Sequence, residues 1–264
     1  MENNIQEKNY PPALEVCVDS FCNAKLAEQG GADRIEFCAN LVEGGVTPSH
    51  SQILHACKFL KIKTFVLIRP RGGDFVYNAD EIDIMKEDVR FCGEAGCEGV
   101  VFGALNPDGS VDISACREIM EIARQYGMET TFHRAFDRTA NMFEALEDLV
   151  SLGFDRVLTS GGRDSALEGA ATINSLIEAG EGRISILPGA GLSPENVIEL
   201  LQLTGSRELH GSLRSLKPSA MQYMTDKMAI PPEERELPVT DPEKVRKVKQ
   251  EIRDFHSKSG GFKA

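Results

Sequence analysis

Short runs of β-forming residues alternate with longer helical segments along almost the whole chain, and this alternation constrains the fold more than any other feature. The mean step from one predicted strand to the next is roughly 28 residues, which is the spacing that βαβ units require. Strands are predicted at residues 14–18, 33–38, 64–69, 99–103, 129–134, 156–160, 184–188 and 208–210. Helices are predicted near residues 20–30, 49–60, 80–95, 112–126, 142–152, 165–180, 193–203 and 241–257.

Eight consecutive β–α units without a break in composition predict a single (β/α)8 barrel of the TIM type. A chain of 264 residues commonly forms one such domain. An open doubly wound sheet is the alternative, but no GxGxxG motif follows the first strand, which disfavours a dinucleotide-binding version of it. We expect the barrel domain to cover residues 14–264, after a polar and disordered extension at residues 1–13.

Residues 212–240 interrupt the alternation. They follow the last predicted strand, they look neither strand-like nor strongly helical, and they are rich in methionine and proline. Because loops of this length are uncommon unless they are functional, we expect a lid or an oligomer contact here, with disorder as the alternative. An oligomer contact would fit a homodimer or a homotetramer.

The alternation of side chains along each strand predicts what fills the barrel. The apolar residues of the first two strands should meet the helices, which turns Glu15, Cys17, Glu36 and Cys38 inward. Buried carboxylates need partners, and Arg69 is the obvious counter-charge for Glu15 or Glu36. We expect these charged residues to form a ligand site in which Arg69 binds the ligand; a self-neutralising network that only fills the barrel is the alternative. The candidate catalytic residues at the C-terminal mouth, where barrel enzymes keep their chemistry, are Glu15, Glu36, Arg69, His133 and His210.

Arginine and glycine residues after several strands predict a mouth that holds an anion. Arginine binds carboxylates and phosphates bidentately, so the tract from Leu67 to Phe75 should meet an anionic ligand or an internal carboxylate. Loops after the seventh and eighth strands often hold phosphate in this fold, although tight turning explains their glycines equally well. The candidate ligand-binding residues are Arg71, Asp74, Arg134, Asp137, Ser160, Gly161, Gly189 and Gly191.

Cys17 and Cys38 suggest a different ligand. They occupy equivalent positions on neighbouring strands, whose axes lie about 4.8 Å apart. Two thiolates at that range could hold a soft ion such as Cu(I), although the stagger of barrel strands could also keep the two sulfurs apart. An odd number of cysteines, seven, without a CxxC pair or a signal peptide predicts free thiols in a reducing compartment.

Composition and missing motifs exclude several function classes. The formal charge of 29 − 41 = −12 argues against nucleic acids and anionic membranes as partners. No apolar run reaches the roughly 18 residues of a membrane span. The absence of a lysine at the C-terminal end of any predicted strand disfavours a Schiff-base aldolase, and the absence of GxSxG disfavours a serine hydrolase.

Several motifs in one order resemble the CutC family of copper-homeostasis proteins, from about Leu14 to the last helix. The motifs are Glu15-Val-Cys-Val-Asp-Ser20, Gly30-Gly-Ala-Asp-Arg-Ile-Glu-Phe-Cys38, Glu43-Gly-Gly-Val-Thr-Pro48, Arg69-Pro-Arg-Gly-Gly-Asp-Phe75, Thr131-Phe-His-Arg-Ala-Phe-Asp137 and Arg156-Val-Leu-Thr-Ser-Gly161. The resemblance implies a TIM-like barrel and a cytoplasmic location, with the nucleus as an additional location. It also implies a role in copper tolerance, with Cu(I) bound at Cys17 and Cys38. Gly211 departs from the family pattern, since many relatives carry Ser or Cys after the histidine.

Two function hypotheses therefore stand beside each other. The first is a copper-homeostasis protein that binds Cu(I). The second is a barrel enzyme acting on a small anionic metabolite, of which a phosphorylated compound is one option. Glu15, Glu36 and His133 would be its acid–base or divalent-metal groups, and its role in copper tolerance would be indirect. A non-catalytic interaction protein would gain support if residues 212–240 plugged the mouth.

Overall fold

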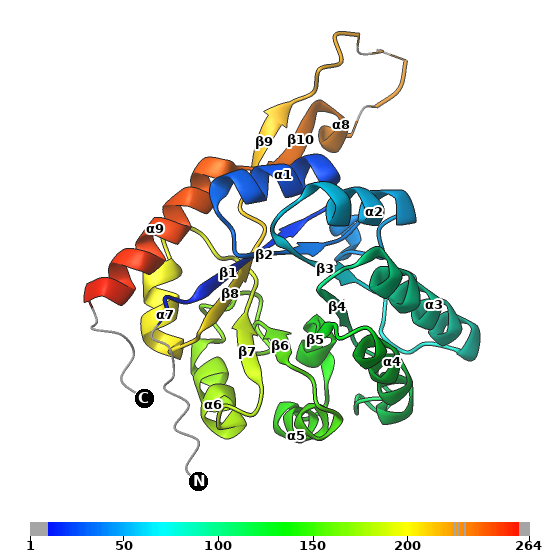
Figure 1. The fold of residues 1–264 in the computed structure, drawn as a ribbon. Helices are drawn as coiled ribbons and strands as arrows, with labels where there is room; N and C mark the ends of the chain where they lie inside the picture. Colours follow the sequence, from blue (N-terminus) through cyan, green and yellow to red (C-terminus); the bar gives the residue numbers. More distant parts are fainter. Residues whose placement is uncertain (1–9, 224, 226, 230, 259–264) are drawn as a thin grey trace.

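The computed structural model describes residues 10–258 except 224, 226 and 230, and it contains a barrel of eight parallel strands (Figure 1). From β1 to β7 each strand pairs with the next one in the chain, and β1 also pairs with β8, giving the order β7-β6-β5-β4-β3-β2-β1-β8. β7 and β8 lie side by side, but no strand pairing joins their described residues. The strands are β1 (Ala13–Val18), β2 (Arg34–Phe37), β3 (Lys63–Leu67), β4 (Gly99–Phe102), β5 (Glu129–Phe132), β6 (Arg156–Thr159), β7 (Ser185–Pro188) and β8 (Glu208–Gly211).

Helices surround the sheet and alternate with its strands, so the predicted (β/α)8 fold is confirmed. The N-cap side chain of Asn78 and the carboxylate of Glu81 form a capping box at the start of the helix that follows β3. Glycines in the left-handed conformation end four of the helices, at Gly31, Gly96, Gly153 and Gly205. The helices are α1 (Phe21–Gly30), α2 (His50–Phe59), α3 (Ala79–Ala95), α4 (Ile113–Gln125), α5 (Met142–Leu152), α6 (Ala170–Gly180), α7 (Val197–Thr204) and α9 (Pro242–Lys258), with short 3-10 turns η1 (Leu41–Glu43) and η2 (Arg134–Arg138).

The strands separate two apolar groups, as their alternation predicts. Leu14, Val16 and Val18 of β1 join the large core between the sheet and the helices. A second, smaller group faces the inside of the barrel and consists of Cys17, Cys38, Phe65, Leu67 and Val101. The inward direction of both cysteines is therefore confirmed.

The prediction for residues 212–240 is wrong in its secondary structure. This segment contains two antiparallel strands, β9 (Arg214–Pro218) and β10 (Glu236–Thr240), and the short helix α8 (Pro232–Arg235). Figure 1 shows the hairpin projecting from the barrel beside α1. Of the predicted N-terminal extension, residues 1–9 lie outside the described residues, and β1 already begins at Ala13.

Candidate functional site

Two arginines at the N-terminal ends of β2 and β6 form the floor of the barrel. The guanidinium groups of Arg34 and Arg156 lie 4.7 and 5.0 Å from the centre of the Phe65 ring. Arg34 donates to Glu15 and, at 2.5 Å, to Glu208. These inward-facing charges were not predicted, although Arg34 has the same parity along its strand as Glu36. The floor therefore contains the self-neutralising network that the sequence left open.

Above this floor, the structure brings Cys17, Glu36 and His210 together. One potential ligand atom from each of the three buried residues lies within 4.8 Å of the other two. The Nε2 atom of His210 is 3.6 Å from Glu36 Oε2, and Cys38 Sγ is 3.7 Å from Cys17 Sγ. A buried set of sulfur, nitrogen and oxygen atoms is able to hold a metal ion, and the sulfur and imidazole donors suit a soft one.

Glu15 lies between the floor and this group. Its Oε1 atom is 2.8 Å from His210 Nδ1, and its Oε2 atom accepts the hydrogen bond from Arg34. Burial alone would raise the pKa of Glu15, but the charges of Arg34 and His210 hold that pKa well below its ordinary value. Ionised Glu15 therefore fixes the His210 ring through Nδ1 and leaves Nε2 directed toward Cys17 and Glu36.

The pKa values of four neighbouring residues are shifted from their ordinary values: Cys17, His210, Glu36 and Cys38. The hydrogen bond with Cys38, together with His210, lowers the pKa of Cys17 to about 5 against the effect of burial. Burial would lower the pKa of His210, but its bonds to Cys17 and Glu15 raise that pKa well above its ordinary value. Burial and the Cys17 charge raise the pKa of both Glu36 and Cys38. These shifts favour the thiolate form of Cys17 and the protonated forms of His210, Glu36 and Cys38.

The expectation that Arg69 neutralises Glu15 or Glu36 is wrong. Its guanidinium group lies 5.0 Å from the centre of the Phe75 ring. The side chain donates to the carbonyl oxygens of Glu43, Gly45 and Gly73 at 3.0, 2.7 and 2.7 Å. Arg69 follows β3 by two residues, so it has left the strand and ties the mouth loops together instead. The counter-charges of Glu15 are Arg34 and His210.

His133 lies apart from the His210 group. Its ring centre is 4.8 Å from that of Phe75, and its Nδ1 atom accepts a hydrogen bond from the Ala135 N–H. No hydrogen bond or ion pair among the described residues joins it to Glu15 or Glu36. The His133 Nε2 and Thr131 Oγ1 atoms are buried without a hydrogen-bond partner. The five candidate catalytic residues thus divide into two groups.

The predicted anion loop after β6 already contains a carboxylate of the chain itself. Asp137 accepts from the backbone N–H groups of Ser160 and Gly162, each at 3.1 Å, and from the Thr159 hydroxyl at 2.5 Å. Arg134 donates to Asp137 at 2.8 Å and to the Ser160 hydroxyl at 2.7 Å. Gly161, in the same turn, donates its N–H to Thr159 Oγ1. The donors that were predicted to hold a ligand therefore hold Asp137.

Arg71 is likewise occupied by internal carboxylates. It donates to Glu81 at 2.6 Å and to Asp74 at 3.0 Å, both near the surface. Gly189 serves close packing, because a Cβ atom there would lie 2.6 Å from Leu158 and 3.2 Å from the His210 ring. Gly191 has a φ of 79°, in the left-handed region. The order of these residues in the sequence gave their location at the mouth but not their partners.

Comparison with known proteins identifies the family. The sequence model of the CutC family matches residues 13–215. The chain belongs to the CutC family. It is 46% identical over 237 residues to the copper homeostasis protein cutC homolog of Homo sapiens, covering 88% of this chain and 86% of that protein. It is 48% identical over 203 residues to a CutC family protein of Xylella fastidiosa, strain 9a5c, covering 77% and 75%.

Solved structures support the same assignment. The crystal structure of CutC from Streptococcus agalactiae superimposes with a TM-score of 0.72 at 33% identity, covering 76% of this chain and 98% of that one. Phosphoribosylanthranilate isomerase from Pyrococcus furiosus matches with a TM-score of 0.54 at 14% identity, covering 92% and 99%, which shows a shared fold alone. Among the residues that the structure describes, none of the helices combines the length and apolar character that crossing a bilayer requires.

Proposed function

We propose that this CutC protein handles Cu(I) inside its barrel, with Cys17, His210 and Glu36 as ligands and Cys38 as an adjacent thiol. The observation that carries the proposal is the approach of their ligand atoms to within 4.8 Å inside the barrel. The copper-homeostasis name of the human relative supports the identity of the cargo.

The chemistry of these residues fits a soft cation. The pKa of Cys17 is lowered to about 5, so its thiolate is present at neutral pH without a proton being removed by the metal. His210 would bind through Nε2 once that nitrogen gives up its proton, because Glu15 holds Nδ1 at 2.8 Å. Thiolate and imidazole are groups that copper and zinc sites use.

A Cu(I) titration against a competing chelator, in an anaerobic reducing buffer, tests the proposal. The Cys17→Ser/Cys38→Ser double variant should lose at least tenfold in affinity, and Cys22→Ser, whose thiol is exposed on α1, should keep the wild-type affinity. A double variant that binds Cu(I) as tightly as the wild type would exclude the barrel cysteines as ligands. Circular dichroism of each variant checks that the barrel is folded.

The second candidate function is an enzyme that acts on a small anionic metabolite, for which copper tolerance is an indirect effect. It is favoured by His133 Nε2 and Thr131 Oγ1, two buried polar atoms without a hydrogen-bond partner, on residues two apart in the chain. A thermal-shift screen with phosphorylated metabolites separates the two proposals. A compound that stabilises the wild type and Cys17→Ser, but not His133→Asn, would favour the enzyme.

We further propose that residues 212–240 form an oligomer contact in a homodimer or homotetramer. Large apolar side chains on this segment are exposed, and an interface would remove them from water. They are Leu216, Met221, Tyr223, Met228 and Leu237, with exposed fractions between 45% and 72%. Light scattering on the Leu216→Lys/Leu237→Lys variant should show a smaller assembly than the wild type. The proposed location is the cytoplasm, with the nucleus as an additional site.

A further inference from the structure

A second pair of thiols lies outside the barrel, on the helical layer. Cys57 is in the last turn of α2, and Cys97 lies between α3 and β4. Their sulfur atoms are 2.9 Å apart, closer than the 3.7 Å between Cys17 and Cys38. Carbon atoms in ordinary contact already stay about 3.5–4.0 Å apart, and sulfur is larger. The two side chains are therefore directed at each other at closer than normal contact distance.

The approach of the two sulfurs suits a covalent bond better than a bound metal. A disulfide requires about 2.05 Å between the sulfurs, so they would need to close by about 0.9 Å. Two thiolates on one zinc ion, each at about 2.3 Å from the metal, would instead have to separate. No group of three metal-ligating residues that includes Cys57 or Cys97 occurs in the part of the chain that the structure describes.

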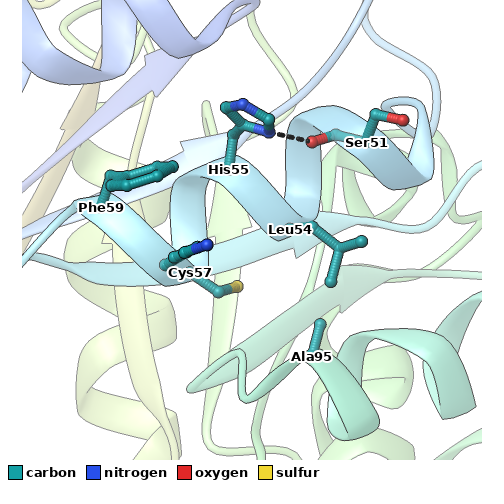
Figure 2. A pocket seen from close by; sticks show the side chains of 7 residues that line it. Ser51, Leu54, His55, Cys57, Phe59 and Ala95 are labelled. Atoms are coloured by element: carbon teal, nitrogen blue, oxygen red, sulfur yellow. Dashed lines mark hydrogen bonds between the residues drawn. The ribbon is translucent and has the colours of Figure 1, made fainter.

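A surface pocket gives a small oxidant access to this pair. It has a volume of about 540 Å³ and is lined by side chains from α2 and the end of α3 (Figure 2). Cys57 is partly exposed and contributes to the lining, while Cys97 is only 6% exposed. Lys58 also lines the pocket and adds a positive charge beside Cys57. An oxidant would therefore reach Cys57 first, and Cys97 would be the resolving thiol.

We propose that Cys57 and Cys97 form a reversible disulfide when the protein meets a peroxide. The Cys57 thiolate attacks one peroxide oxygen, which gives a sulfenic acid and releases hydroxide; the hydroxide takes up the thiol proton as water. Cys97 then loses its proton, its sulfur attacks the Cys57 sulfur, and the sulfenic oxygen leaves as a second water. In total, two thiols are oxidised and one peroxide is reduced to two waters. A small dithiol reverses the step by exchange.

The bond would tie α2 to the start of β4 and close a loop of about 41 residues. The pKa of Cys57 is raised by its hydrogen bond with Cys97 and by burial, so the thiolate is scarce and the reaction is slow. A lasting cross-link that stabilises the oxidised protein fits these properties better than a fast peroxide sensor. This proposal does not depend on which ligand the barrel holds.

Treatment of the metal-free protein with hydrogen peroxide, followed by thiol counting in denaturant, tests the proposal. The wild type should fall from seven free thiols to 7 − 2 = 5, and its melting temperature should rise by roughly 5–15 °C. Cys57→Ser should keep its six thiols and gain no stability. Cys97→Ser should lose at most the Cys57 thiol, as a sulfenic acid that no second thiol resolves, and it should also gain no stability. The matched control is Cys22→Ser, which removes an exposed thiol on α1 and should still lose two.

Peptide mapping of the unreduced wild type identifies the bond without relying on any variant. A Cys57–Cys97 peptide that disappears after treatment with a dithiol supports the proposal. Three outcomes overturn it: seven thiols that survive the oxidant, a bond between Cys17 and Cys38, or a bond between Cys97 and Cys92, whose thiol also lies within reach of Cys97. Irreversible oxidation of Cys57 to a sulfinic acid would overturn it as well.

Discussion

Replacing Arg34 with methionine should strongly destabilise the barrel, because Arg34 is the main counter-charge of a buried carboxylate. The Arg34 side chain is 8% exposed and the Glu15 side chain 1% exposed. Methionine keeps the apolar stem but leaves Glu15 and Glu208 without this partner. Removing one member of a buried ion pair costs roughly 3–5 kcal/mol. Because His210 still bonds to Glu15 at 2.8 Å, we expect the lower end, about 3 kcal/mol.

Urea unfolding at pH 7 in a reducing buffer measures this loss. Arg183→Met is the matched control, since Arg183 bonds to Glu147 at 2.6 Å but is 39% exposed, and it should cost less than about 1 kcal/mol. A loss in Arg34→Met no larger than in the control would refute the assignment of Arg34 as a buried counter-charge.

The pH dependence of the same variant provides a second check. Despite burial, Arg34 and His210 hold the pKa of Glu15 well below its ordinary value. Ionised Glu15 therefore contributes to the unfolding free energy of the wild type at a pH above the ordinary glutamate pKa, and this contribution is lost as the pH falls below that pKa. In Arg34→Met the pKa of Glu15 should rise, and protonated Glu15 needs no counter-charge. The difference in unfolding free energy between wild type and variant should therefore narrow as the pH falls toward 4.

Two further predictions concern burial and close packing. Burial and Arg69 lower the pKa of His133 to about 3. As the pH falls below about 6.5, the ordinary pKa of histidine, His133 takes up a proton in the unfolded chain but not in the folded protein, so the folded protein loses stability. His133→Asn should remove roughly 2–3 kcal/mol of the wild-type stability loss between pH 7 and pH 4.5, measured by urea unfolding. A Cβ atom on Gly169 would lie 1.9 Å from the Ser160 carbonyl oxygen, so Gly169→Ala should cost roughly 2–3 kcal/mol. Gly180→Ala, whose Cβ would meet Ile184 at an ordinary 3.5 Å, should be neutral or stabilising by up to about 1 kcal/mol in thermal unfolding.

The alternation of side chains along the strands was sufficient to predict the fold and the inward direction of Cys17, Glu36 and His210. It could not predict which charges meet, because alternation gives the face of a strand but not its layer in the barrel. Arg34 and Arg69 both face inward by parity, yet the first lies at the floor beside Glu15 and the second beyond the end of β3. A register between strands would have been needed to choose between them.

The partner of the glycine loop after β6 could not be predicted for a related reason. A glycine turn whose backbone N–H groups lack an acceptor predicts a negatively charged partner. It does not predict whether that partner is a ligand from solution or a side chain of the protein. Here Asp137, on the preceding mouth loop, supplies it. The β9–β10 hairpin was hidden by Pro218 and Pro238, which count against a strand in the middle of a sheet but are tolerated in the edge strands of a two-stranded one.

Glu15 couples the floor of the barrel to the proposed Cu(I) site, and this coupling predicts an effect at a distance. In the wild type the Glu15 charge is shared between Arg34 and His210. In Arg34→Met the same charge would act on His210 alone and would hold its proton more tightly. Cu(I) needs a neutral His210 Nε2, so the metal must displace that proton.

Arg34→Met should therefore weaken Cu(I) binding by about tenfold at pH 7, although Arg34 is not among the proposed ligands; one pKa unit on His210 corresponds to about 1.4 kcal/mol. This loss of Cu(I) affinity should become smaller as the pH rises, because His210 Nε2 is then deprotonated before the metal binds. Arg183→Met should bind Cu(I) as the wild type does at every pH. Chelator competition at pH 7 and pH 9, on protein shown to be folded by circular dichroism, measures both. Equal affinities for Arg34→Met and the wild type at pH 7 would refute this coupling, either because His210 is not a ligand or because Glu15 does not set the pKa of His210. The His210→Asn variant distinguishes these two explanations. It loses affinity for Cu(I) only if the imidazole binds the metal.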